Sequence, residues 1–194
     1  MTLRIAREAD APALERLIEL TARTSLARHY SKAQLDVAVG PVFGLDRQLI
    51  RDGTYFVAEP DGEIIACGGW SKRQAVYGGD RDRGGAGADV ALDPARDAAR
   101  VRAFFVHPAW ERRGLGRALL AASEAAMRAA GFTRVELVAT LAGEPLYARF
   151  GYSVVERYDA PLPGGLTIAV VRMARTLPPD PSPRCGTSDS FDPL

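Results

Sequence analysis

Residues 104–120, with the sequence FFVHPAWERRGLGRALL, limit most strongly what this chain can fold into. An apolar run ends at Pro108, a loop with two arginines and two spaced glycines follows, and a helical pattern then begins. Such a loop can bind an anion, because the first amides of a helix have no partner within it and the helix dipole favours negative charge there. Arg112, Arg113 and Arg117 supply more positive charge than one phosphate requires, and a diphosphate would use all of it.

Two well-known phosphate motifs do not fit this loop. The P-loop pattern G-x-x-x-x-G-K-[ST] does not occur in the sequence. The dinucleotide pattern G-x-G-x-x-G needs a third glycine, but Leu119 stands at that position, and the first glycine comes seven residues after His107, too late for that tight turn. The short G-x-G motif alone is equally compatible with a solvated loop whose arginines serve solubility.

Composition excludes several classes of protein. The 194 residues are enough for one domain with a real core, and 47% hydrophobic with 25% charged residues is ordinary for a soluble globular protein. A net charge of +1 gives no reason to expect nucleic acid or membrane binding. Cys67 and Cys185 do not make a disulfide framework, and no Cys/His cluster has zinc-ligand spacing, so no metal is expected. The charged N-terminus and the absence of an 18-residue apolar run predict a cytoplasmic protein.

Hydrophobic periodicity predicts an α/β (α+β) fold, with a mixed central β-sheet flanked by helices. Asp10 is expected to cap the first helix, and Ser31 is a candidate cap for a second helix that ends at Gly40. The expected strands are 3–6, 55–59, 63–70, 100–107, 133–140, 152–159 and 166–175, and the expected helices are 11–24, 31–39, a turn at 46–50, 114–130 and 143–150.

The long helix and two irregular segments carry further expectations. In the helix, Glu124 and Arg128 should form an i,i+4 pair on the solvent side. The apolar stripe facing the core is predicted to be Leu115, Leu119, Ala122, Ala126 and Met127. Residues 74–99 are rich in Gly, Asp and Arg without a sustained period, so no regular structure is predicted there. The domain is expected to span residues 1–175, and the proline-rich segment 176–194 is expected to be a disordered tail.

Two motifs together resemble the GNAT superfamily of N-acetyltransferases. Val106-His107-Pro108 followed by residues 111–116 matches the strand ending in V-x-P and the [QR]-x-x-G-x-[GA] loop of that family, with Glu111 where the family usually has Gln or Arg. Downstream, PLYARFGY matches the family's helix-to-strand segment, with Tyr147 four residues before a glycine. The resemblance covers about residues 2–175 and implies the GNAT-like acyltransferase fold.

The resemblance implies acetyl-CoA, or another short acyl-CoA, as cosubstrate. Its pantetheine arm would run beside Phe104, Phe105 and Val106, where their strand separates from strand 133–140, and the amide near Val106 could face the thioester oxygen. The residues implied for the pyrophosphate are Arg112, Arg113, Gly114, Leu115, Gly116 and Arg117.

The implied reaction is direct attack of an amine on the thioester. By the same resemblance, Tyr147 would protonate the departing thiolate; the alternative is that it packs and hydrogen-bonds to the cofactor. No general base is assigned. Glu136 can equally be an exposed strand carboxylate, Glu144 a first-turn helix charge, and a water chain can serve instead.

Four other positions have two interpretations each. Arg102 lies within a strand expected to be central. It either binds an acidic acceptor or, as we favour, pairs with Asp93 or Asp97 or extends its charged group to the sheet edge. The pair His29-Tyr30 lies in the region that covers the acceptor in the family, but loop packing is the more common role. Trp70 and Tyr77 flank the long loop and could line an acceptor pocket, although core packing is the usual role for Trp70. His107 is expected to be exposed at its strand end.

Three functions compete at this level. The preferred one is an acetyl-CoA-dependent N-acetyltransferase acting on a small-molecule or peptide amine. The second is a non-catalytic acyl-CoA-binding sensor or regulatory module. The third, a nucleic-acid-binding domain, is disfavoured because the charge is balanced and no aromatic-basic platform occurs. Whether the chain forms a homodimer stays open.

Overall fold

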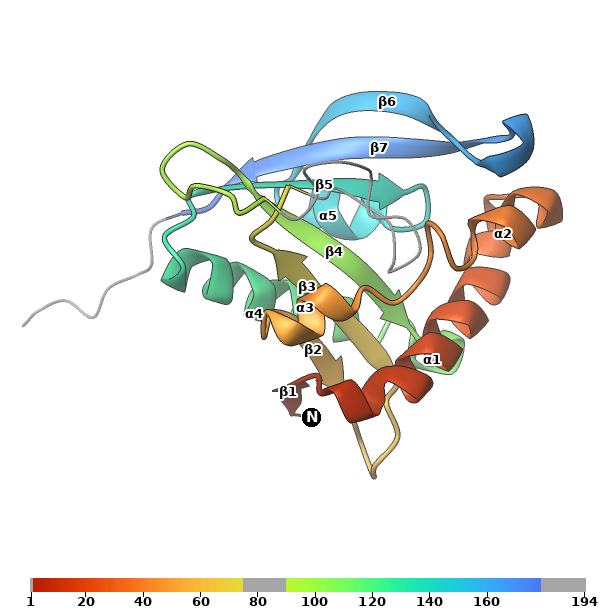
Figure 1. Cartoon of the computed structure of the whole chain (residues 1–194), viewed down its shortest axis with the longest axis horizontal. Helices are drawn as coiled ribbons and strands as arrows, with labels where there is room; N and C mark the ends of the chain where they lie inside the picture. Colours follow the sequence, from red (N-terminus) through yellow and green to blue (C-terminus); the bar gives the residue numbers. More distant parts are fainter. Residues whose placement is uncertain (1, 75–89, 179–194) are drawn as a thin grey trace, which may run out of the picture.

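The computed structural model describes residues 2–74 and 90–178. Tyr77, Cys185 and most of the predicted tail therefore lie outside the described residues. The described strands form a seven-stranded sheet in the order β1-β2-β3-β4-β5-β7-β6 (Figure 1). The strands are β1 (Leu3–Ile5), β2 (Tyr55–Ala58), β3 (Ala66–Ser71), β4 (Ala99–Val106), β5 (Arg134–Thr140), β6 (Ser153–Pro161) and β7 (Thr167–Thr176). The α-helices are α1 (Ala11–Thr24), α2 (Lys32–Ala38), α3 (Arg47–Arg51), α4 (Leu115–Ala129) and α5 (Glu144–Arg149).

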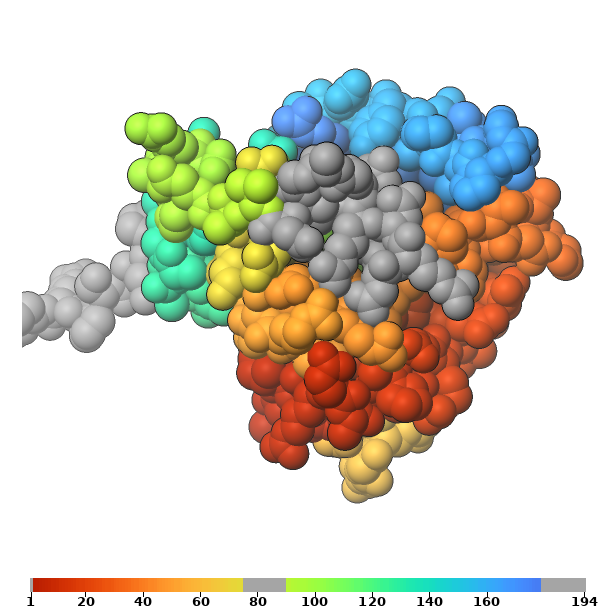
Figure 2. Space-filling model, in the orientation of Figure 1, coloured from red at the N-terminus to blue at the C-terminus, as the bar shows by residue number. Residues whose placement is uncertain are grey.

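Helices cover both faces of this mixed sheet. β4 and β5 are parallel, whereas the other neighbouring strands are antiparallel. The helices α1, α2 and α3 pack into one hydrophobic cluster, and α4 and α5 pack into clusters on the opposite face (Figure 1). The long β6–β7 hairpin, blue in Figure 2, lies beside the α2 region, where the Gln34 side chain donates to the Thr167 carbonyl at 2.7 Å. The predicted fold class is confirmed.

The first helices begin where the sequence predicts, with one exception in capping. Ser31 caps α2, since its hydroxyl accepts a hydrogen bond from the Gln34 amide at 3.3 Å. Asp46 caps α3 through the Gln48 amide at 3.0 Å. Asp10 occupies the N-cap position of α1 as predicted, but its carboxylate accepts no bond from the α1 amides and instead binds the Arg4 guanidinium at 2.7 and 2.9 Å.

The position of Glu124 contradicts the predicted solvent side of α4. Glu124 does pair with Arg128, at 3.6 Å, but its side chain is only 5% exposed. The Tyr152 hydroxyl donates to it at 3.1 Å and the Arg175 guanidinium at 2.8 Å. A buried carboxylate is tolerated here because a cation and a hydroxyl satisfy it. The buried face of α4 therefore includes Leu120, Ser123 and Glu124, which were not predicted, whereas Ala122 and Ala126 are only partly buried.

Two boundaries also differ from expectation. β3 begins at Ala66, because the Glu63 amide closes a turn onto the Pro60 carbonyl at 3.0 Å. At the other end, β7 runs to Thr176, and the Leu177 amide donates to the Thr133 carbonyl at 2.8 Å. Leu177 is buried, so the folded domain extends past the predicted boundary at residue 175.

Candidate active site

The central strands of the sheet separate toward their C-terminal ends. In β4 and β5, both fully described, the backbones pair only at Ala99 with Val135 and at Arg100 with Glu136. Both strands continue beyond these pairs, β4 to Val106 and β5 to Thr140. The separation predicted between these strands is confirmed, and it leaves a site between two strand backbones.

A bulge shapes β4 where it separates. The register between β3 and β4 shifts between Cys67 and Gly69, and Ala103 on β4 has a φ of 53°. A left-handed backbone is unusual for a residue with a side chain and needs support from its surroundings. Tyr55 provides it, because its hydroxyl donates to the Ala103 carbonyl at 2.9 Å. Complete burial raises the pKa of Tyr55 and keeps this hydroxyl protonated as a donor.

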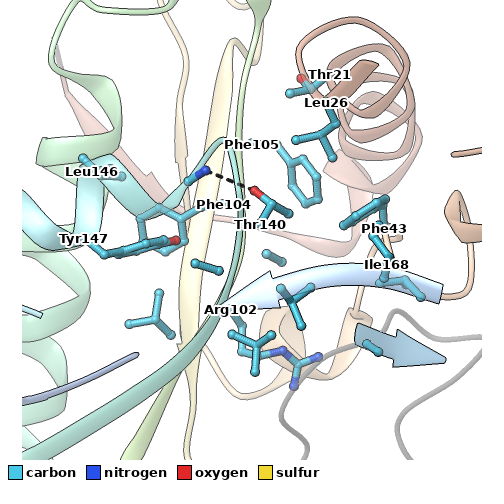
Figure 3. Close-up of a pocket in the computed structure, with 18 of the residues that line it drawn as sticks. Thr21, Leu26, Phe43, Arg102, Phe104, Phe105, Thr140, Leu146, Tyr147 and Ile168 are labelled. Atoms are coloured by element: carbon cyan, nitrogen blue, oxygen red, sulfur yellow. Dashed lines mark hydrogen bonds between the residues drawn. The ribbon is translucent and has the colours of Figure 1, made fainter. Parts of the chain in front are cut away.

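A cavity of about 210 Å³ occupies the space between the separated strands (Figure 3). From one face of the sheet it is lined by Gly116 of α4 and by Leu146 and Tyr147 of α5. From the other face it is lined by Leu26, which follows α1, and Phe43, which precedes α3. The strands contribute Val101, Arg102, Ala103, Phe104, Phe105, Val106, Val138, Ala139 and Thr140. Because residues from both faces line one cavity, it passes through the sheet.

The loop before α4 presents unused backbone donors beside this cavity. Gly114 has a φ of 86°, a conformation that glycine adopts without strain, and it places the chain at the start of the helix. The amides of residues 112–117 donate no hydrogen bond to any residue of 2–74 or 90–178. These amides and the helix dipole together suit an anion.

Close packing and exposed arginines characterise the same loop. A Cβ at Gly116 would lie 3.0 Å from Cδ2 of Leu146, so α4 and α5 approach closely at the cavity mouth. The side chains of Arg112, Arg113 and Arg117 are exposed. The Arg113 guanidinium lies 4.7 Å from the centre of the Trp110 ring, which orients it.

Glu111, the residue that departs from the family motif, is turned toward α1. Its carboxylate accepts a short hydrogen bond from the Ser25 hydroxyl at the end of that helix. This contact joins the loop before α4 to the opposite face of the sheet. The Glu111 carboxylate therefore binds the Ser25 hydroxyl and not the amides of its own loop.

Tyr147 projects from α5 into the cavity. Its ring makes edge contacts with Phe104, at 6.2 Å between centroids, and with Tyr152, at 5.8 Å. The hydroxyl points into the cavity toward Thr140 (Figure 3) and has no hydrogen-bond partner within the described part of the chain. Burial raises the pKa of the Tyr147 phenol above its ordinary value, so the group is a protonated donor at neutral pH.

The two carboxylates considered as bases are held elsewhere. Glu136 binds Arg100 at 2.5 Å and Arg172 at 3.3 Å. Glu144 accepts from Arg157 at 2.9 Å, which holds the pKa of its carboxyl below the ordinary value. Among the described residues that line the cavity, neither carboxylate occurs.

Arg102 has a different partner from the predicted Asp93 or Asp97. Its guanidinium binds the Asp46 carboxylate at 3.1 Å, and the two side chains are 3% and 4% exposed. Asp93 and Asp97 lie in the turn before β4, where the Asp93 amide donates to the Asp97 carboxylate at 2.7 Å. Residue 102, further along β4, instead faces the N-terminus of α3. Pairing of Arg102 is confirmed, but the predicted partners were wrong, and the alternative of a charged group extended to the sheet edge is wrong because the side chain is buried.

Sequence reasoning undervalued Tyr30. Its hydroxyl donates to the Ala169 carbonyl of β7 and accepts from the Leu141 amide that follows β5, each at 2.9 Å. It therefore fixes the turn between Thr140 and Tyr147. The only signal in the sequence was the position of this tyrosine, directly before the helix cap at Ser31.

The remaining candidates differ in their environment. His29 is exposed, so the loop packing expected for the His29-Tyr30 pair holds for Tyr30 and not for His29. Trp70 is buried and packs edge-on against Phe132 at 5.8 Å, which confirms its predicted place in the core. His107 is partly buried rather than fully exposed, and its Nδ1 accepts from the Ala109 amide at 3.2 Å.

None of the helices formed by residues 2–74 and 90–178 is long and apolar enough to span a bilayer. The same residues hold no group of three or more His, Cys, Asp and Glu side chains placed to bind a metal ion.

Comparison with known proteins identifies similar sequences and folds. A family model described as the acetyltransferase (GNAT) family matches residues 15–152. No curated protein has a significantly similar sequence. A GCN5-related N-acetyltransferase from Rhodopseudomonas palustris superposes with a TM-score of 0.67 at 17% identity, covering 91% of this chain and 95% of that chain.

Two further structures share the fold and were solved with coenzyme A or its acetyl form. PaiA N-acetyltransferase from Thermoplasma acidophilum, in complex with coenzyme A, has a TM-score of 0.60 at 13% identity and covers 90% of this chain and 98% of that chain. A GNAT family acetyltransferase from Brucella melitensis, in complex with acetyl-CoA, has a TM-score of 0.55 at 18% identity and covers 92% of this chain and 89% of that chain. At these identities the likeness concerns the fold.

Proposed function

Because this chain belongs to the acetyltransferase (GNAT) family, we propose that it transfers the acetyl group of acetyl-CoA to a primary amine. Family membership supports acetyl transfer from acetyl-CoA in general. The amine acceptor, the direct mechanism and the residue roles below are our proposal. The observation that carries it is the phenol of Tyr147, which is directed into a cavity between separated strands beside the amides of residues 112–117. Neither the phenol nor these amides have a hydrogen-bond partner among residues 2–74 and 90–178.

The residues present fit coenzyme A. The amides of residues 112–117, with Arg112, Arg113 and Arg117, would bind the diphosphate, because backbone donors and cations converge there. The backbone of Phe104, Phe105 and Val106 would bind the pantetheine arm, since no pairing with β5 occupies this part of β4 within the described sheet. A Cβ at Gly116 would lie 3.0 Å from Cδ2 of Leu146, so a side chain at that mouth requires Leu146 to move.

The reaction proceeds by direct attack of the neutral amine on the thioester carbonyl. The carbon–nitrogen bond forms, the carbon–sulfur bond breaks, and the nitrogen loses one proton to solvent. The departing thiolate takes one proton from the Tyr147 phenol, which solvent then restores. Backbone amides of β4 near Val106 would stabilise the charge that develops on the carbonyl oxygen. Tyr147 suits the role of acid because burial keeps it protonated.

Replacing the phenol tests this proposal. In Tyr147→Phe, kcat for thiol release from acetyl-CoA should fall about 100-fold, while acetyl-CoA affinity changes little, because only the general acid is lost. Since the pKa of Tyr147 is raised, the wild-type kcat should not decline from about pH 7 to about pH 9 through loss of this acid.

Tyr152→Phe is the matched control. It removes another buried phenol, one that binds Glu124 and is absent from the described cavity lining, so stability should fall while kcat is retained. Full activity of Tyr147→Phe at every pH would refute the acid assignment. Acetyl-CoA binding by the wild type without thiol release for any amine would instead indicate the non-catalytic acyl-CoA-binding module.

A further inference from the structure

The end of the cavity that lies on the α1 face has an apolar surface. We name it the acceptor end and define it by Leu26, Val42, Phe43, Pro161 and Ile168, all of which line the cavity. They come from the segments after α1 and before α3 and from the β6–β7 hairpin, and Figure 3 shows Leu26, Phe43 and Ile168 grouped on one side. Leu26, Phe43 and Ile168 are 6%, 7% and 1% exposed, so they form a fixed wall.

The charge at this end is balanced. Arg102 lines the cavity, and its guanidinium is matched by the buried Asp46 carboxylate at 3.1 Å. Asp46 is held in turn by the Gln48 amide at the start of α3. Arg102 is the one charged side chain in the described part of the lining, and the Asp46 carboxylate behind it offsets its charge. Residues 2–74 and 90–178 therefore leave no net charge at this end with which to recognise a second ionic group on the acceptor.

We propose that the acceptor is a small primary amine whose body is apolar and uncharged, of the alkylamine or arylalkylamine class. This inference rests on the proposed acetyl transfer and specifies its substrate. A second ammonium or a carboxylate on the acceptor would lose its hydration against Leu26, Phe43 and Ile168, and the described part of the lining offers it no net opposite charge in return. The volume of about 210 Å³ is shared with the reacting end of the cosubstrate, which limits the acceptor to a small body.

The same surface also assists the chemistry. An apolar environment disfavours an ammonium ion, so it promotes release of the amine proton to water before attack. The neutral amine then forms the carbon–nitrogen bond, the carbon–sulfur bond breaks, the nitrogen releases its second proton to solvent, and Tyr147 protonates the sulfur. The wall therefore selects the acceptor and favours its nucleophilic form.

Two matched pairs of amines test the acceptor class. Hexylamine and 1,6-diaminohexane differ by one distal ammonium, and 3-methylbutylamine and leucine differ by one carboxylate. Initial rates of thiol release from acetyl-CoA give kcat/KM for each. kcat/KM should be at least about tenfold higher for hexylamine than for 1,6-diaminohexane, and for 3-methylbutylamine than for leucine. The reason is that burying one unpaired charge costs more free energy than a tenfold change in kcat/KM represents.

A charge placed on the wall should change the preference. Val42 is only partly buried, so Val42→Glu is expected to fold. It should raise kcat/KM for 1,6-diaminohexane relative to hexylamine about tenfold, by pairing with the distal ammonium. Val42→Gln is the matched control of equal size without charge, and it should leave the preference for hexylamine in place.

Failure of this inference is distinguishable from failure of the proposed function. Equal or better use of 1,6-diaminohexane or leucine would overturn the acceptor class and leave acetyl transfer standing. If no amine released thiol, the proposed transfer would fail. The acceptor end would then be tested by calorimetry on the protein with CoA: tighter binding of N-hexylacetamide than of N-acetyl-1,6-diaminohexane supports the inference, and equal binding overturns it.

Discussion

The two ends of the cavity are built in different ways. The end proposed to bind the cofactor, here named the cofactor end, is lined by Phe104, Phe105, Val106, Gly116 and Tyr147. The loop of residues 107–115 lies beside it, and this end offers mainly backbone groups. The acceptor end combines side chains from Leu26, Phe43 and Ile168, which are widely separated in the sequence. When the backbone of one segment binds a ligand, the residues that shape it are contiguous and form a motif that a sequence shows. Recognition by assembled side chains leaves no such motif, and it depends on contacts that hold distant segments in place.

The largest expected effect concerns the ion pair that supports the acceptor end. Asp46→Ala leaves the Arg102 charge buried without this partner and removes the cap of α3. We expect a loss of about 4 kcal/mol in the free energy of unfolding, measured by urea denaturation. Asp36→Ala, which removes exposed ion pairs with Arg23 and Lys32, is the control and should change little. Equal stability of the two variants would contradict the support assigned to Asp46.

The second prediction addresses the cofactor end. Gly116→Asp places a Cβ 3.0 Å from Leu146 and an anion among the amides proposed to bind the diphosphate. Acetyl-CoA affinity should fall about 100-fold, or about 2.7 kcal/mol, as measured by calorimetry. Gly116→Ala adds the Cβ without the charge, and because the Leu146 side chain can move, it should lose far less. If Gly116→Asp kept the acetyl-CoA affinity of the wild type, and circular dichroism showed an intact fold, the loop would not be part of the cofactor site.

The sequence predicted those parts of the fold whose causes are local. α1 runs from Ala11 to Thr24 as expected, because its apolar spacing and the proline in its first turn are sufficient signals. The separation of β4 from β5 and the glycine at the start of α4 followed from the resemblance carried by one contiguous motif.

The contacts that were missed join residues far apart in the chain. Arg102 and Asp46 are 56 positions apart, and Tyr30 reaches a carbonyl 139 positions away. Glu124 was placed on the solvent side because helical periodicity counts apolar residues and cannot register the Arg175 and Tyr152 groups that satisfy a buried carboxylate. A single sequence does not reveal such pairs, since each partner alone resembles an ordinary surface residue.

The third prediction separates the two ends through Tyr30. Tyr30→Phe leaves the Leu141 amide and the Ala169 carbonyl without their partner and should cost about 2 kcal/mol of stability. Because Ala169 directly follows Ile168 of the acceptor end, loss of its bond should raise KM for the amine while acetyl-CoA affinity is retained. His29→Ala, at the exposed neighbouring position, is the control. If Tyr30→Phe lowered only the acetyl-CoA affinity, the role of Tyr30 in supporting the acceptor end would be contradicted.

The smallest expected effect concerns the exposed arginines. Arg117→Ala should weaken acetyl-CoA binding only about two- to fivefold, because an exposed charge is screened and the backbone amides supply most of the interaction. Added salt should shrink the difference between the variant and the wild type. A loss as large as that of Gly116→Asp would mean that side chains, rather than the backbone, dominate the cofactor end.

The most direct test of the central claim is calorimetric titration of the full chain with acetyl-CoA, CoA and NAD. The account predicts binding of acetyl-CoA and CoA to one site with a dissociation constant on the order of micromolar, and no comparable binding of NAD. Absence of binding by both CoA species would contradict the account. The chain would then have the fold of the family, with the separated strands and the loop of residues 112–117, but would not bind the cosubstrate of the family.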